Sequence, residues 1–181
     1  MGASGLPAPD LTALYRAEFP YVWHSLRRLG IPSRDLEDLA HDVFVVVQQR
    51  LGDFDASRPV KPWLFGIAFR VASRFLRRAG HRREVLDDPP DAPGAERPAD
   101  QALEDEEARR LVLRALGMLD VDKRAVLVMH DLDGHPMPEI ASALSIPLNT
   151  AYSRLRLARE DFTRAVLEVR SKRGLRWERD R

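Results

Sequence analysis

The chain has 181 residues, of which 44% are hydrophobic, with no cysteine and a formal net charge of +1. This length suits one or two small domains, and the lack of cysteine excludes disulfides, thiolate metal sites and thiol nucleophiles. The longest aliphatic or aromatic run, residues 43–47, is too short to span a membrane, and residues 1–9 lack a signal-peptide pattern, so we expect a cytoplasmic protein without membrane insertion.

Charge is strongly segregated along the chain. Residues 1–83 and 108–181 each carry a net charge of +5, whereas residues 84–107 hold 10 acidic residues against 1 basic residue. Two basic blocks indicate a polyanionic partner, although a solvated arginine-rich surface would give the same composition.

Proline and aspartate are concentrated in one internal segment, and helical spacing of apolar residues dominates on both sides of it. The pattern predicts an all-α chain with two small helical domains joined by a flexible acidic linker. The expected divisions are a disordered tail over 1–9, a first domain over 10–83, the linker over 84–102, a second domain over 103–168 and a basic tail over 169–181.

The first domain is predicted to contain helices over about 11–29, 35–51 and 62–79, separated by breaks at Gly30-Ile31-Pro32 and at the loop 52–59. The second of these helices has a broad apolar stripe, and its polar residues fall on the opposite side. Such a polar face beside an apolar stripe suits a protein interface, and it equally suits solvation. The polar residues singled out are Asp38, Asp42, Gln48 and Gln49.

The third predicted helix carries a basic ridge apart from its apolar face. The ridge consists of Gly66, Arg70, Ser73 and Arg77, and it is widened by Arg74 and Arg78 and preceded by Trp63. Guanidinium groups pair with phosphates and an indole stacks on an unpaired base, so the ridge suits a nucleic-acid backbone. A solvated arginine face with a core tryptophan is the alternative.

The second domain shows a more specific pattern. A helix is predicted over 121–130, a short helix over 137–144 and a longer helix from 148 to about 169. The long helix has its expected buried positions at Leu148, Ala151, Leu155, Ala158 and Phe162, and its outward side is polar and rich in arginine. This is the helix-turn-helix arrangement, whose second helix fits the DNA major groove. An ordinary helical hairpin is the alternative.

Two sequence blocks resemble a known family when they are taken together. Glu37–Phe44 and Pro62–Ala68 resemble region 2 of bacterial sigma-70-type factors, and Glu139–Ala141, Ser145–Pro147 and Thr150–Leu155 resemble their region 4. Because only a tether separates the two blocks, the chain is similar to the extracytoplasmic-function (ECF) group. The resemblance implies a transcription initiation factor that binds core RNA polymerase, opens the −10 promoter element through region 2 and reads the −35 element through region 4.

The resemblance also implies residue roles. Asp38, Asp42, Gln48 and Gln49 would dock on the β′ clamp helices of the polymerase, and region 4 would contact its β flap. Contacts to the −10 DNA would come from Phe54, Trp63, Arg70, Arg74 and Arg77. In region 4, Tyr152, Ser153 and Arg156 would face −35 bases, Thr150 and Arg154 would hold phosphates, and Asn149 lies beside them. An anti-sigma factor is a further expected partner.

The sequence departs from the family pattern at four positions. Arg70 and Arg74 stand where many members have Asn and Asp, and Tyr152 stands where many have a basic residue. We therefore expect altered promoter preferences. Pro136 replaces the usual capping serine of the short helix, which should alter the start of that helix without abolishing it.

Two other functions are compatible with parts of the sequence. A conventional helix-turn-helix regulator would bind duplex DNA without polymerase, but it has no need of the acidic helix followed by the Trp/Arg helix. The doublets His41-Asp42 and His130-Asp131 occur in metal-dependent helical phosphohydrolases, but the remaining histidines lack ligand spacing. We expect no catalytic residue, no metal and no cofactor.

Overall fold

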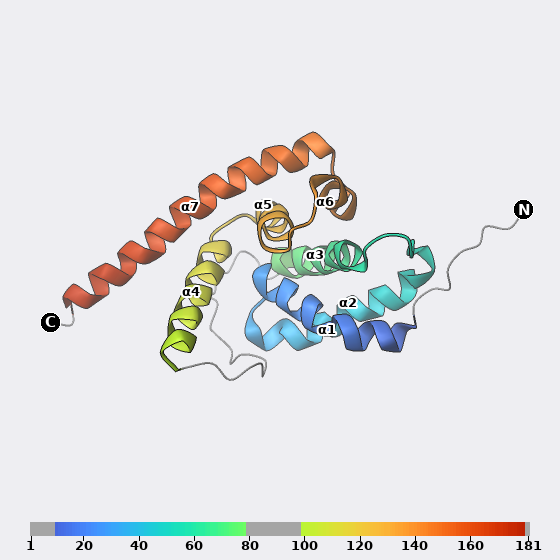
Figure 1. Cartoon of the computed structure of the whole chain (residues 1–181), viewed down its shortest axis with the longest axis horizontal. Helices are drawn as coiled ribbons and strands as arrows, with labels where there is room; N and C mark the ends of the chain where they lie inside the picture. Colours follow the sequence, from blue (N-terminus) through green and yellow to red (C-terminus); the bar gives the residue numbers. More distant parts are fainter. Residues whose placement is uncertain (1–9, 79–98, 180–181) are drawn as a thin grey trace, which may run out of the picture.

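The computed structural model describes residues 10–78 and 99–179, with side chains over 10–78 and 106–172, and the described residues form helices and short connections only (Figure 1). None of the described helices is both long and apolar enough to cross a membrane. The N-terminal half contains α1 (Leu11–Arg28), the 3-10 turn η1 (Ser33–Asp35), α2 (Leu36–Arg50), the 3-10 turn η2 (Leu51–Asp53) and α3 (Val60–Arg78). The C-terminal half contains α4 (Ala99–Gly117), α5 (Val121–Leu127), the π-helical turn η3 (Val128–Leu132), α6 (Met137–Leu144) and α7 (Leu148–Arg179).

Local sequence explains the boundaries of α1. The Asp10 carboxylate accepts hydrogen bonds from the backbone N–H groups of Thr12 and Ala13, which caps the start of the helix. Pro20 lies inside the helix without ending it. The helix ends before Gly30, whose φ of 94° lies in the left-handed region that glycine adopts at no steric cost. The predicted helices of this half are thus confirmed to within two residues at each end.

The C-terminal half differs from expectation at several boundaries. The helix α4 begins at Ala99, inside the segment 84–102 that we expected to be a linker, and residues 79–98 lie outside the described part. The helix predicted over 121–130 is instead α5 followed by a π-helical turn. The short helix α6 has the predicted bounds, and Pro136 precedes it without a side-chain cap, as anticipated.

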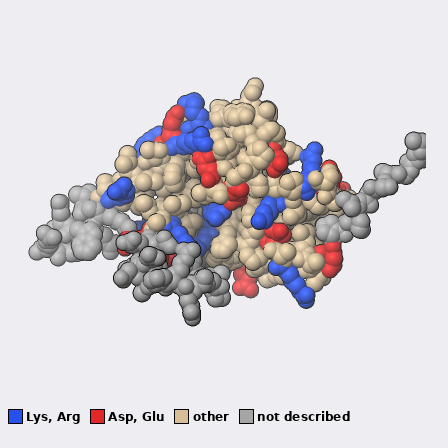
Figure 2. Space-filling view, viewed as in Figure 1, with Lys and Arg blue, Asp and Glu red and all other residues tan. Residues whose placement is uncertain are grey.

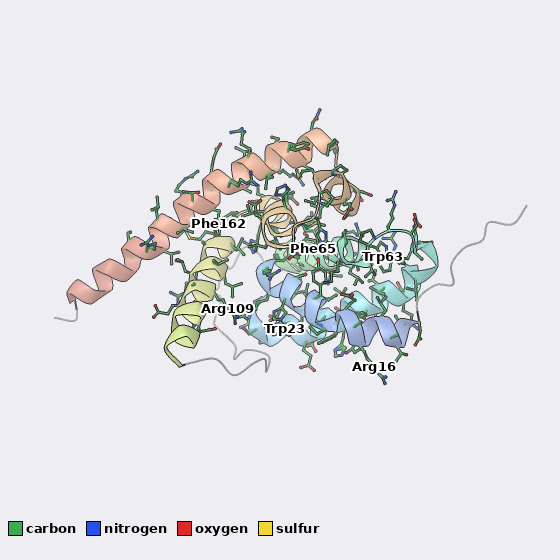
Figure 3. The ribbon with its side chains drawn as sticks, in the orientation of Figure 1. Arg16, Trp23, Trp63, Phe65, Arg109 and Phe162 are labelled. Carbon is green, nitrogen blue, oxygen red and sulfur yellow. The ribbon has the colours of Figure 1, made fainter. Side chains whose placement is uncertain are left out.

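The long helix α7 extends ten residues beyond its expected end near Val169, so the described part of the expected basic tail is helical. Ala151, Leu155 and Ala158 are buried as predicted, but Leu148 is 42% exposed because it begins the helix beyond the packed core. Phe162 is half-buried and projects from α7 toward α4 (Figure 3).

The two halves pack against each other. The buried side chains form one continuous cluster that draws on both halves, and the helix α3 lies between α1 and α2 on one side and α5 and α6 on the other (Figure 1). Phe65, near the middle of α3, is fully buried at this junction (Figure 3). The expected two small helical domains are confirmed, and the structure also places them in direct contact.

Candidate nucleic-acid and polymerase interfaces

The predicted basic ridge on α3 is only partly exposed. Arg74, Arg77 and Arg78 face solvent, as expected for a nucleic-acid surface. Gly66 and Ser73, which we predicted on the same ridge, are buried. The prediction was wrong for these two residues because it considered α3 with a single partner, whereas α6 packs against the opposite side of the helix.

A close backbone approach explains why Gly66 is a glycine. A Cβ atom at this position would overlap the carbonyl oxygen of Ala143 on α6. Beside it, the Arg70 guanidinium donates a hydrogen bond of 3.3 Å to that same carbonyl. The helix-turn-helix half therefore covers the first part of the ridge.

A crevice of about 600 Å³ remains open between the start of α3 and α6. Phe54 and Trp63 lie on its N-terminal side with ring centroids 4.9 Å apart, and Trp63 is seen near the start of α3 in Figure 3. Arg50 and Arg70 also line it, and burial, with a smaller effect of the Arg50 charge, lowers the pKa of Arg70 below its ordinary value. Arg58 and the carboxylates of Asp53, Asp55 and Glu139 also line the crevice, so its charge is mixed, and the paired aromatic rings are the feature that suits a base.

The outward face of α7 is open to solvent. Asn149, Tyr152, Ser153 and Arg156 are exposed, and Tyr152 is 54% exposed. Along this helix, basic and acidic side chains lie close together at the upper left of Figure 2.

Two predicted −35 residues are half-buried. These are Thr150 and Arg154, and Arg154 forms an ion pair of 3.3 Å with Asp122 of α5. Arg156 pairs with Glu160 one turn later at 2.7 Å, and both of these side chains are largely exposed. Such pairs exchange readily for phosphate or base contacts because exposed ion pairs contribute little free energy.

The predicted polymerase-docking residues occupy one face of α2. Asp38, Asp42, Gln48 and Gln49 are all exposed. Val45, between them in sequence, is 52% exposed, so the face also offers an apolar contact. A polar rim around an exposed apolar side chain is typical of a protein interface.

The sequence did not reveal the polar contacts between the two halves. Asp133, in the turn after η3, accepts hydrogen bonds from the Tyr21 hydroxyl at 3.0 Å and from Arg28 at 2.7 Å. Burial, followed by the nearby Asp133 carboxylate, raises the pKa of Tyr21 well above its ordinary value. Arg124 is 5% exposed and donates to the carbonyl oxygens of Leu29, Gly117 and Leu119. Burial lowers its pKa to about 10.

The His-Asp doublets do not form a metal centre among the described residues, where no group of three or more ligand-type side chains converges. Asp131 is engaged in a bidentate pair with Arg159 at 2.6 and 2.9 Å, and this pair lowers its pKa. His41 instead lies beside Tyr15, with Nε2 3.1 Å from the hydroxyl oxygen.

Comparison with protein families finds two matches in the order that the motifs predicted. Residues 14–82 match the model for sigma-70 region 2, and residues 109–162 match that for sigma-70 region 4. Among curated relatives, the RNA polymerase sigma factor NccH of Alcaligenes xylosoxydans is 32% identical over 142 residues, which cover 76% of each chain. The ECF RNA polymerase sigma-E factor of Escherichia coli K12 is 30% identical, covering 72% of this chain and 73% of that one. The chain belongs to the sigma-70 family, in its ECF group.

Solved structures agree with this assignment. The structure of CnrH in complex with the cytosolic domain of CnrY superposes on 88% of this chain with a TM-score of 0.61 and 27% identity. The sequence of CnrH from Cupriavidus metallidurans is 33% identical over 163 residues, covering 81% of each chain. The structure of the sigma factor RpoE with the anti-sigma factor NepR from Bartonella quintana has a TM-score of 0.66 at 19% identity, which supports the fold alone.

The ECF factor is thus a transcription initiation factor that directs core RNA polymerase to promoters. This assignment is favoured over a conventional helix-turn-helix regulator because the N-terminal half matches region 2, which such a regulator lacks.

Proposed function

We propose that α3 and the loop before it bind the −10 element of the promoter. Phe54 and Trp63 would stack on an unpaired base at the start of α3, and Arg70, Arg74 and Arg77 would hold the phosphates. The proposal is supported by the 4.9 Å ring pair and by the exposure of Arg74 and Arg77 on the same helix. Stacking would offset the few kcal/mol that unpairing and unstacking a base cost.

The start of α7 is the proposed −35 reader. Tyr152, Ser153 and Arg156 would contact base edges, with Asn149 beside them, because these are the exposed side chains of its first turns. Thr150 and Arg154 would contact phosphates, with Arg154 exchanging Asp122 for DNA.

The exposed face of α2 is the proposed docking surface for the β′ clamp helices of core polymerase, through Asp38, Asp42, Gln48 and Gln49, while the C-terminal half would engage the β flap. Bound together on the polymerase, the two halves would read two separate promoter elements.

An anti-sigma factor is a further proposed partner. Two structurally similar sigma factors were solved in complexes, CnrH with the cytosolic domain of CnrY and RpoE with the anti-sigma factor NepR. Co-purification of the factor from its native host would recover such a partner. Recovery of a free and constitutively active factor would contradict this part of the proposal.

The observation that carries the proposal is the ordered pair of matched regions, each with DNA-type side chains exposed on one helix. Run-off transcription with matched core polymerase and a native promoter tests it, after start sites have been mapped by overexpression. Addition of the factor should confer promoter-specific initiation. Failure to initiate with a matched core and a mapped promoter would overturn the proposal.

The docking face is tested separately. The Asp42→Ala variant should weaken binding to core polymerase while leaving binding to −35 duplex unchanged. The matched control is Glu18→Ala, which removes a half-buried carboxylate on α1 instead of one on the docking face. If Asp42→Ala and the wild type bind core polymerase with equal affinity, the Asp42 carboxylate is not part of the interface.

A further inference from the structure

We propose that the free factor holds itself closed through contacts between its own two halves, in a state that covers the −10 face of α3 and leaves the −35 face of α7 accessible. The inference rests on the proposed DNA roles of these two helices. It goes beyond them by assigning a regulatory function to Tyr21, Arg28, Gly66, Arg124 and Asp133, none of which belongs to the proposed interfaces.

The first step of the argument is steric. Backbone atoms of α6 approach α3 so closely at Gly66 that no side chain fits between the helices, and Arg70 is bound to the carbonyl of Ala143. Pro138, Glu139 and Ser142 of α6 also form one wall of the crevice that holds Phe54 and Trp63. A DNA strand following α3 from Trp63 toward Arg74 would have to occupy the space that α6 fills. Closure and −10 binding are therefore mutually exclusive.

The second step concerns a polar cluster that holds the halves together, formed by Asp133, Tyr21 and Arg28 and called the latch below. The Asp133 side chain is only 7% exposed, and its two oxygens accept one hydrogen bond from Arg28 and one from Tyr21, both on α1. All of these partners lie on the other half of the chain, so separation would leave the carboxylate without them. Charge-assisted hydrogen bonds in a partly buried site are the stronger kind.

The third step is the Arg124 junction beside the latch. The Arg124 guanidinium binds the carbonyl of Leu29 in the N-terminal half. It also binds the carbonyls of Gly117, at the end of α4, and Leu119, before α5, so one buried side chain connects both halves. Glycine suits position 30 because its φ of 94° strains other residues, and a Cβ there would force the guanidinium to move. The latch and the junction lie away from the outward face of α7, whose first turns remain exposed.

The test compares two carboxylates that lie two residues apart. Asp133→Asn weakens the latch between the halves, whereas Asp131→Asn weakens an ion pair with Arg159 inside the C-terminal half and serves as the matched control. Gly66→Ala provides an independent route to opening, because alanine favours the α3 helix but clashes with α6. Circular dichroism checks that each variant is folded.

Binding of the free factor is measured with two fluorescent probes made from a mapped promoter, a single strand carrying the −10 element and a duplex carrying the −35 element. Asp133→Asn should raise the affinity for the −10 strand about tenfold, because apparent affinity follows the open fraction. Affinity for the −35 duplex should not change in any variant, and Asp131→Asn should match the wild type on both probes.

Opening is followed independently by energy transfer between dyes on introduced cysteines. The chain has no cysteine of its own, so Ala17→Cys on α1 and Leu167→Cys on α7, both exposed, label one residue in each half. The double variant Asp133→Asn/Gly66→Ala should show reduced transfer efficiency. The proposal is overturned if transfer is unchanged in the double variant, or if the −10 affinity of Asp133→Asn equals that of the wild type. Run-off transcription reports on the proposed function separately, since it does not depend on which state the free factor adopts.

Discussion

The two helices assigned to DNA differ in how freely they are presented. The first part of the ridge on α3 faces α6. Gly66 is buried there, and Arg70 donates a hydrogen bond to the backbone carbonyl of Ala143. The helix α7 begins with a row of exposed polar side chains that the N-terminal half leaves uncovered. The accessibility of a DNA-binding residue in this chain thus depends on packing between the halves as much as on the pattern of its own helix.

The largest effect should come from removing the residue that joins the halves. Arg124→Met keeps an apolar side chain of similar length but leaves the carbonyls of Leu29 and Leu119 without their buried donor. We expect a loss of about 3 kcal/mol in the free energy of unfolding, measured by urea denaturation. Weaker packing between the halves should also make α3 as accessible to DNA as α7, so the two helices would no longer differ in accessibility.

The control for that variant is Arg159→Met, which removes an exposed arginine from a pair inside one half. It should leave the free energy of unfolding close to that of the wild type, since exposed ion pairs contribute little. If both variants lose the same stability, the buried junction has no special role.

A smaller effect is expected from substitutions on the exposed face of α7. Arg156→Ala should change which −35 bases are tolerated and weaken binding to the preferred sequence about tenfold, whereas Arg154→Ala should weaken binding to all sequences. Competition binding against a set of single-base −35 duplex variants distinguishes the two. An equal loss on every duplex for Arg156→Ala would contradict its assignment as a base reader.

The smallest expected effect is a pH dependence of the contact between the two halves. Burial and Asp133 raise the pKa of Tyr21 in the closed state, so the neutral hydroxyl stabilises closure below about pH 10 and this stabilisation is lost as the pH rises above it. Energy transfer in the labelled factor should be constant below about pH 10 and fall progressively as the pH rises above it. Tyr21→Phe should lose this component of the pH dependence, and an unchanged profile in that variant would exclude the hydroxyl.

Much of the fold could be predicted because it depends on local signals. Helical spacing and breaking residues placed α1, α2, α3 and α6 within two residues, and Pro136 was correctly predicted not to prevent α6. The exposed polar face of α2 and the outward face of α7 followed from helical spacing as well. The residue roles on those faces remain predictions.

The contacts between the halves could not be predicted, because they join residues about 100 positions apart with no local signature. In the sequence, Asp133 has the pattern of an ordinary turn residue. Arg124 has the pattern of an ordinary charged helix residue, and no periodicity indicates that its side chain is buried. One signal was available, namely Gly66, since a glycine inside a helix costs about 1 kcal/mol relative to alanine and often marks a close backbone approach. It was instead assigned to the exposed ridge.

Gly30 lies where the two halves of the chain meet. Its backbone lies where other amino acids are strained, and the space beside it is filled by the guanidinium that ties the two halves together. Any bulkier amino acid at this position would force the Arg124 guanidinium to move away from the carbonyl oxygens that it binds. Under the proposed closed state, one substitution at Gly30 would therefore shift the free factor toward its open form.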